Sequence, residues 1–205
     1  MESLVQDTIE SRVQSVLAKI RSAAEKAGRP ASSVRLVAAT KTVPVQKIAE
    51  GVQAGLAILG ENRVQEALSK IPAFKPGPVQ WHFIGQLQRR KVRSVVGVFE
   101  LIHSVDSLEL AQEIDRRAGD AGHRQDVLLE VNIGNEPTKA GFCPEDVRQA
   151  VSELAQLSHI RIKGLMAIPP PTIDPGSARP YFRKLTELAK MIDTQHLPSV
   201  KMDEL

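Results

Sequence analysis

The first part of the chain places its apolar residues at helical spacing, with charged residues between them. Gly28 and Pro30 then interrupt the pattern, and glycine and proline are common directly after the end of a helix. The apolar positions are Leu4, Ile9, Val13, Val16, Leu17, Ile20 and Ala24. The pattern therefore predicts one long amphipathic helix over residues 4–27.

Beyond this helix, short apolar runs alternate with amphipathic stretches. The short runs are typical of buried strands, and the stretches between them are typical of helices. The predicted strands cover residues 34–41, 56–62, 79–85, 98–105, 125–133, 160–168 and 200–205. The predicted helices cover residues 44–54, 63–71, 86–96, 107–119, 144–157 and 178–193. This alternation predicts an α/β fold with a parallel sheet covered by helices.

A parallel sheet of this kind is either an open doubly wound sheet or a TIM-type (β/α) barrel. No glycine-rich dinucleotide motif or Walker loop follows any predicted strand, which removes the usual nucleotide signature of the open sheet. Polar or functional side chains occur instead at several strand ends, namely at Lys41, Asn62, His82, His103, Asn132 and Met166. A barrel gathers strand ends at one mouth, where barrel enzymes keep their chemistry, so the barrel is favoured.

Lys41 ends the strand predicted over residues 34–41, and two interpretations of it stay open. A lysine at a strand end commonly extends into solvent, because burying an unpaired ammonium is costly. A lysine at the mouth of a barrel can instead be partly desolvated, which lowers its pKa and lets it form a Schiff base with an aldehyde.

Composition limits the possible functions. The 205 residues suit one domain, and no run is long and apolar enough to span a membrane. A net charge of +3 and 3% aromatic residues argue against nucleic acid as a partner, so the basic run Arg89–Arg93 is interpreted as a solvated helix face.

The single cysteine, Cys143, and the absence of a signal-peptide pattern predict a reducing, cytoplasmic location. No spacing of ligands suggests a metal site.

Five segments together resemble the pyridoxal phosphate homeostasis proteins, also called proline synthase co-transcribed proteins. The segments are Ala38-Ala39-Thr40-Lys41, Gly60-Glu61-Asn62-Arg63-Val64-Gln65-Glu66, Trp81-His82-Phe83-Ile84-Gly85-Gln86-Leu87-Gln88, Val131-Asn132-Ile133 and Gly164-Leu165-Met166-Ala167-Ile168-Pro169. The resemblance runs in order from about residue 30 to the C-terminus. It implies a single barrel domain over residues 1–205, of the alanine-racemase N-terminal kind.

The resemblance also implies a function. Pyridoxal 5′-phosphate is expected as a Schiff base on Lys41, with Asn62, His82 and Met166 lining its pocket and no catalytic residue. Core packing of Met166 and a hydrogen-bonded structural role of His82 remain alternatives. The implied role is cofactor homeostasis and delivery to apo-enzymes that use this cofactor, by a monomer or weak homodimer, without defined turnover. Because family members continue into a segment that holds the phosphate, the barrel is expected to be incomplete at its C-terminal end.

Three other functions are alternatives to this one. The first is a pyridoxal-phosphate-dependent amino-acid racemase or decarboxylase, although such enzymes add a second domain. The second is an aldolase whose lysine attacks a substrate carbonyl without a cofactor. The third is an interaction protein that uses the basic residues 89–96.

Overall fold

The structure, a computed structural model, describes residues 7–74, 77 and 79–205. The predicted helix start at residues 4–6, and the N-terminal residues 1–6 on which the absence of a signal-peptide pattern rests, lie outside this range. The chain forms two compact units, one ending at His82 and the other running from Phe83 to Leu205. The expectation of a single domain over residues 1–205 stays a prediction.

The first unit begins with a long helix, as the periodicity predicts. Helix α1 (Ile9–Lys26) starts at Thr8, whose side-chain oxygen accepts a hydrogen bond from the backbone N–H of Ser11 at 3.1 Å. It contacts α2, and Gln14 donates to the backbone carbonyl of Ala54 at 2.9 Å. The remaining elements of this unit are η1 (Ala31–Ser33), β1 (Val37–Ala39), α2 (Val45–Gln53), β2 (Ile58–Glu61), α3 (Val64–Lys70), η2 (Ile71–Phe74) and β3 (Gln80–Phe83), of which β3 extends one residue beyond the unit.

The strands of the first unit lie in chain order, β1-β2-β3. Strands β1 and β2 pair in parallel, with Val37 opposite Ile58 and Ala39 opposite Gly60. All residues of β2 are buried, as expected of a strand covered on both faces. Strand β1 is shorter at both ends than the strand predicted over residues 34–41. At its C-terminal end the chain turns directly, and the N–H of Val43 donates to the carbonyl of Thr40.

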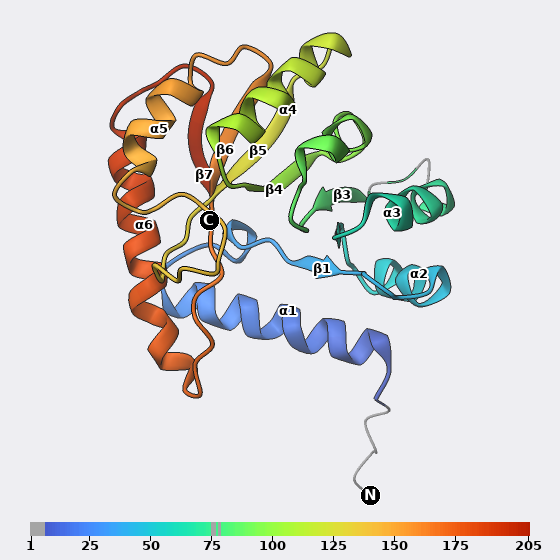
Figure 1. Ribbon diagram of the computed structural model, residues 1–205. Coiled ribbons are helices and arrows are strands. Elements are labelled where there is room, and N and C mark those ends of the chain that lie inside the picture. The colour runs from blue at the N-terminus through green and yellow to red at the C-terminus, as the bar shows by residue number, and fades with distance from the viewer. Residues whose placement is uncertain (1–6, 75–76, 78) are drawn as a thin grey trace, which may run out of the picture. The chain divides into compact units, whose positions relative to one another are not determined.

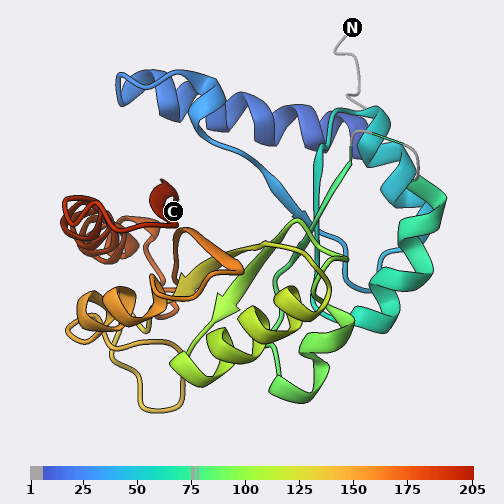
Figure 2. The same cartoon turned by 90° about the horizontal axis from the view of Figure 1, so that it is seen from above.

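The second unit holds the strands β4-β5-β6-β7, also in chain order and paired in parallel. Helices α4, α5 and α6 follow one another along this sheet, as Figures 1 and 2 show. The elements are η3 (Arg89–Ser94), β4 (Leu101–Val105), α4 (Leu108–Asp120), β5 (Gln125–Glu130), α5 (Val147–Leu154), β6 (Ile160–Met166), η4 (Pro175–Ala178), α6 (Arg179–Asp193) and β7 (Val200–Glu204). The alternation of strand and helix predicted from the sequence is therefore confirmed.

One predicted helix has a different geometry. Residues 86–96 were expected to form an amphipathic α-helix, but residues Arg89–Ser94 form a 3₁₀-helix. Val92 is fully buried while its basic neighbours are exposed, and the N–H of Val95 donates to the carbonyl of Val92. The segment is short and closed by i→i+3 bonds, which is typical of 3₁₀-helices used as connectors. The basic run is solvated, as predicted.

Among the residues that the structure describes, no helix is long and apolar enough to cross a membrane.

Candidate functional site

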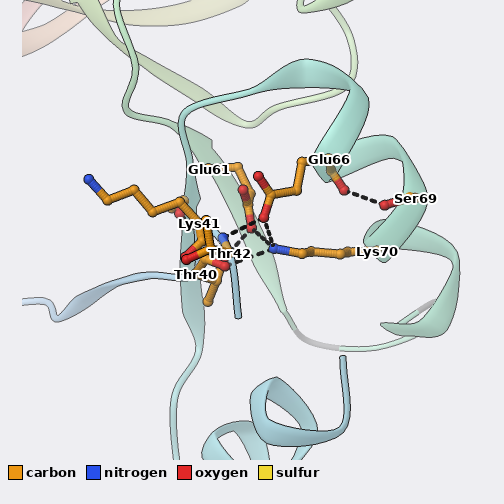
Figure 3. A network of polar contacts seen from close by, with 8 residues as sticks. Thr40, Lys41, Thr42, Glu61, Glu66, Ser69 and Lys70 are labelled. Carbon is orange, nitrogen blue, oxygen red and sulfur yellow. Dashed lines mark hydrogen bonds and ion pairs between the residues drawn. The ribbon is translucent and has the colours of Figure 1, made fainter. Parts of the chain in front are cut away.

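Lys41 lies two residues beyond the end of β1, in the turn that leads to α2. Exposure alternates along this segment: Ala39 and Lys41 are exposed, whereas Thr40 between them is buried. Figure 3 shows the side chain of Lys41 extending away from the polar cluster that surrounds Thr40. The amine therefore stands on the open face of the strand end, where a ligand can reach it.

The buried face of the same strand end carries a charged cluster. The Nζ atom of Lys70, the last residue of α3, donates three hydrogen bonds of 2.7 Å each. The acceptors are Oε1 of Glu61, Oε1 of Glu66 and the backbone carbonyl oxygen of Thr40. The hydroxyl of Thr40 also donates to Oε1 of Glu61 at 2.7 Å. We call these four residues, Thr40, Glu61, Glu66 and Lys70, the Lys70 cluster.

The charges of the Lys70 cluster stabilise one another. Burial lowers the pKa of Lys70, but its hydrogen bonds to Glu61 and Glu66 outweigh that effect and raise its pKa overall. The pKa of Glu66 is lowered by the hydrogen bond from Lys70, with a further contribution from the backbone N–H of Thr42. Lys70 is therefore charged at neutral pH, although it is only 6% exposed. A buried ammonium persists in a fold only when it is paired in this way.

Asn62 follows β2 as Lys41 follows β1. Extending the register of Ala39 with Gly60 by two residues places Lys41 and Asn62 next to each other at the ends of neighbouring strands. The Oδ1 atom of Asn62 is buried and has no hydrogen-bond partner within the described part of the chain. A buried amide oxygen without a donor is unusual in folded proteins and calls for an explanation, such as a ligand.

His82 lies within β3, one residue before the strand ends at Phe83, and it is 3% exposed. Its side chain is thus packed in the strand rather than presented beyond it. The structure brings Lys41 and Asn62 to neighbouring strand ends, and it places His82 in the buried part of the next strand.

Met166 belongs to the second unit, where it ends β6 and is half-buried. It lines a cavity of about 300 Å³, together with Ser104, Glu130 and Asn132. Burial raises the pKa of Glu130, and the nearby charge of Asp106 raises it further. Met166 therefore borders a polar hollow and is not enclosed in an apolar core.

Asn132 organises the loop at the rim of this cavity. Its Nδ2 atom donates to the carbonyl of Glu136 at 2.8 Å, and its Oδ1 atom accepts from the N–H of Glu136 at 3.0 Å. Phe142 pairs with Val131 in an isolated parallel bridge, which brings the far end of the loop back to the strand. The residue was predicted only as a polar strand end, and the structure gives it a structural role.

The sequence did not single out Lys70 or Glu130. The spacing of Glu66 and Lys70, four residues apart on a helix, was a usable signal, but such pairs are ordinarily exposed and of little consequence. A more telling signal was Glu61, a carboxylate ending an otherwise apolar run, since such a residue needs a cationic partner.

Comparison with known proteins identifies the family. The family described as alanine racemase, N-terminal domain, matches residues 12–202. The pyridoxal phosphate homeostasis protein of Aquifex aeolicus is 44% identical over 194 residues, which are 93% of this chain and 85% of that protein. The fold class, an α/β protein of the alanine-racemase N-terminal kind, is confirmed by these matches.

Two solved structures resemble the chain closely. A protein of unknown function from Bifidobacterium adolescentis superimposes with a TM-score of 0.87 at 36% identity, covering 93% of this chain and 81% of that one. PipY of Synechococcus elongatus, solved with pyridoxal 5′-phosphate bound, gives a TM-score of 0.79 at 33% identity, covering 95% of this chain and 86% of that one. The chain therefore belongs to the pyridoxal phosphate homeostasis protein family.

Proposed function

We propose that this protein binds pyridoxal 5′-phosphate covalently through Lys41 and takes part in the homeostasis and delivery of that cofactor. The observation that carries the proposal is the exposed amine of Lys41 at the end of β1, in a chain 44% identical to a pyridoxal phosphate homeostasis protein. The structure of PipY with pyridoxal 5′-phosphate bound, at 33% identity, supports the same cofactor for this chain.

The residues around Lys41 fit the chemistry of this cofactor. When bound, pyridoxal phosphate would supply an aldehyde, which condenses with a primary amine to form a C=N bond and release its oxygen as water. Lys41 offers such an amine on the open face of its strand. The buried Oδ1 of Asn62 has no donor among the described residues, so a ligand can provide one. Asn62 thus contributes an acceptor at the strand end next to Lys41.

Contacts of His82 and Met166 with the cofactor are also part of the proposal. His82 is buried in β3, so its contribution is to hold the strand and to present one edge of its ring. Met166 borders a cavity and contributes an apolar surface. Of these residues, only Lys41 forms a covalent bond, and Asn62 and His82, which belong to the same unit, shape the pocket around it.

We propose no catalytic turnover for this chain. Its relatives are named for cofactor homeostasis rather than for a reaction. A covalently bound but unconsumed cofactor suits storage and transfer to apo-enzymes. Transfer is tested by mixing the loaded protein with an apo-enzyme that needs this cofactor and measuring the activity recovered. Recovery no faster than with an equal amount of unbound cofactor would argue against delivery.

Reduction with borohydride tests the attachment itself. The purified protein is loaded with pyridoxal 5′-phosphate, reduced and digested, and the modified peptide is identified by mass. We expect the label on Lys41 and a loss of visible absorbance in Lys41→Ala. The exposed Lys47 of helix α2 gives a matched control, because Lys47→Ala should leave the absorbance unchanged. Label on another lysine, with full absorbance in Lys41→Ala, would contradict the proposal.

A further inference from the structure

We propose that Lys70 is a positioning residue for Lys41, acting through the backbone on both sides of it. The inference rests on the proposed function, since it concerns how the cofactor lysine is presented. Lys70 lies at the end of α3, and its ammonium reaches the chain between β1 and α2.

The two residues flanking Lys41 are both tied to this cluster. On one side, Nζ of Lys70 donates to the carbonyl oxygen of Thr40 at 2.7 Å. On the other, the backbone N–H of Thr42 donates to Oε1 of Glu66, the same atom that accepts from Lys70. Peptide groups before and after Lys41 are thus held by charged partners, and such hydrogen bonds are roughly twice as strong as neutral ones. Figure 3 shows both flanking residues at the cluster.

The turn that these bonds hold is a strained one. Thr42 has a φ of 62°, in the left-handed region that β-branched residues rarely adopt. Its hydroxyl donates to the carbonyl of Lys41 at 2.6 Å, which adds a local constraint on the same peptide. A strained conformation of this kind costs on the order of 1–3 kcal/mol and persists only where surrounding contacts enforce it. The Lys70 cluster supplies those contacts.

The same turn sets the direction of the Lys41 side chain. Because side chains alternate along an extended segment, holding Thr40 on the buried face places Lys41 on the open face. If the turn relaxes, the amine of Lys41 samples many directions. A covalent bond to a bound aldehyde then forms less favourably, even where the pocket for the rest of the ligand is intact.

The test separates positioning from general stability by comparing two ligands. Pyridoxal 5′-phosphate can bond to Lys41, whereas pyridoxine 5′-phosphate carries an alcohol in place of the aldehyde and cannot. We expect Lys70→Met to weaken pyridoxal 5′-phosphate binding by roughly tenfold or more. We expect its effect on pyridoxine 5′-phosphate binding to be much smaller. Lys47→Met, on the exposed face of α2, is the control and should match the wild type for both ligands.

A second measurement needs no ligand. In the apo-protein, hydrogen exchange at the amides of Thr42 and Val43 should accelerate in Lys70→Met by a larger factor than exchange at the amides of β2, because release of the turn adds to the general loss of stability. If Lys70→Met does not fold, Glu66→Ala replaces it, since Glu66 is partly exposed and its loss leaves Lys70 paired with Glu61. Removing Glu66 deletes the acceptor of the Thr42 amide, so the same two changes are expected.

The outcomes distinguish this inference from the proposed function. The positioning role alone is overturned if the wild type binds pyridoxal 5′-phosphate on Lys41 but Lys70→Met does not lose affinity selectively. That is the case when the variant loses affinity equally for both ligands, or loses none. Wild-type protein that takes no label on Lys41 overturns the proposed function. In that case unchanged exchange at Thr42 and Val43 would overturn the positioning role too, and faster exchange there would support it.

Discussion

Oε1 of Glu61 lies 2.7 Å from Nζ of Lys70, and the two side chains are 0% and 7% exposed. This pair joins the end of β2 to the end of α3, and it shares the hydroxyl and carbonyl of Thr40. Removing one member leaves the other buried without that partner. The pair therefore makes stability sensitive to single substitutions and much less sensitive to a double one.

Lys70→Met is expected to lower the free energy of unfolding by about 3–5 kcal/mol, because the carboxylate of Glu61 remains buried and unpaired. The double variant Glu61→Leu/Lys70→Met removes both charges and should lose clearly less than the sum of the two single variants. Urea denaturation of the four proteins at pH 7 gives this coupling energy. Strict additivity of the two single losses would contradict a direct interaction.

Gly141 holds the loop at the end of β5 close to the strand. Its φ is +113°, and a Cβ atom there would lie 2.8 Å from the backbone nitrogen of Asn132 and 2.9 Å from the carbonyl oxygen of Glu130. Gly141→Ala is therefore expected to cost about 2 kcal/mol or more of unfolding free energy. Gly122→Ala is the control, since Gly122 has a φ of +61° and no atom within 4 Å of its added Cβ. Equal losses in a thermal melt would show that the close contact is unimportant.

Glu113 makes stability depend on acid pH. Hydrogen bonds from Arg116, then from Arg117, lower its pKa from the usual 4.5 to about 2. A group whose pKa is lower in the folded state stabilises the fold above its unfolded pKa and loses that contribution as pH falls through its folded pKa. The contribution of Glu113 should thus be complete above about pH 5 and decline toward pH 2.

The variant Glu113→Gln isolates this contribution. It should be less stable than the wild type at pH 6, and the difference should shrink as the pH falls toward 2. Denaturation midpoints measured across this range provide the comparison. Glu109→Gln, at an exposed position of the same helix, is the control. A difference that stays constant with pH would exclude the ionised carboxylate as its cause.

The pKa of Glu130 shifts in the opposite direction to that of Glu113. Burial, and then the charge of Asp106, raise its pKa, so the folded state favours the protonated form. A carboxyl whose pKa is raised by folding costs stability as the pH rises through the interval between its unfolded and folded pKa values. Glu130→Gln should therefore be more stable than the wild type at pH 8, with a smaller difference at pH 4. Equal unfolding free energies at pH 8 would show that the side chain is hydrated in the folded protein.

The order of helices and strands was predictable, because the burial of one face of each element gives its sequence a recognisable spacing of apolar residues. The helix predicted at 107–119 is Leu108–Asp120, and the strand predicted at 160–168 is Ile160–Met166. Strand ends were less predictable. Residues 131–133 read as part of β5, but the strand ends at Glu130. The returning loop is held there by bonds from the N–H of Phe142 to the carbonyl of Glu130 and from the N–H of Asn132 to the carbonyl of Phe142. Apolar patterns report burial, and a buried loop end gives the same signal as a strand.

The position of Lys41 at a strand end was predictable because its neighbours form a recognisable apolar run. The Lys70 cluster was not, because its members come from three segments and nothing in the helix pattern of residues 63–71 shows that Lys70 is buried. Which charged residues pair over long distances depends on the tertiary structure. A single sequence shows the charged residues but not which of them meet. The assignments of Asn62, His82 and Met166 to the cofactor remain predictions, whereas their locations in β2, β3 and β6 or directly after them are now known.

The Lys70 cluster draws on β1, β2 and α3, so it cannot exist before all three have assembled. A chain still emerging from synthesis, or one that has misfolded, has no ordered turn around Lys41 and no fixed direction for its amine. On the proposed function, capture of a reactive aldehyde then requires the finished first unit. Immature copies of the protein would leave the aldehyde in solution, and the amount sequestered in the cell would follow the number of correctly folded molecules.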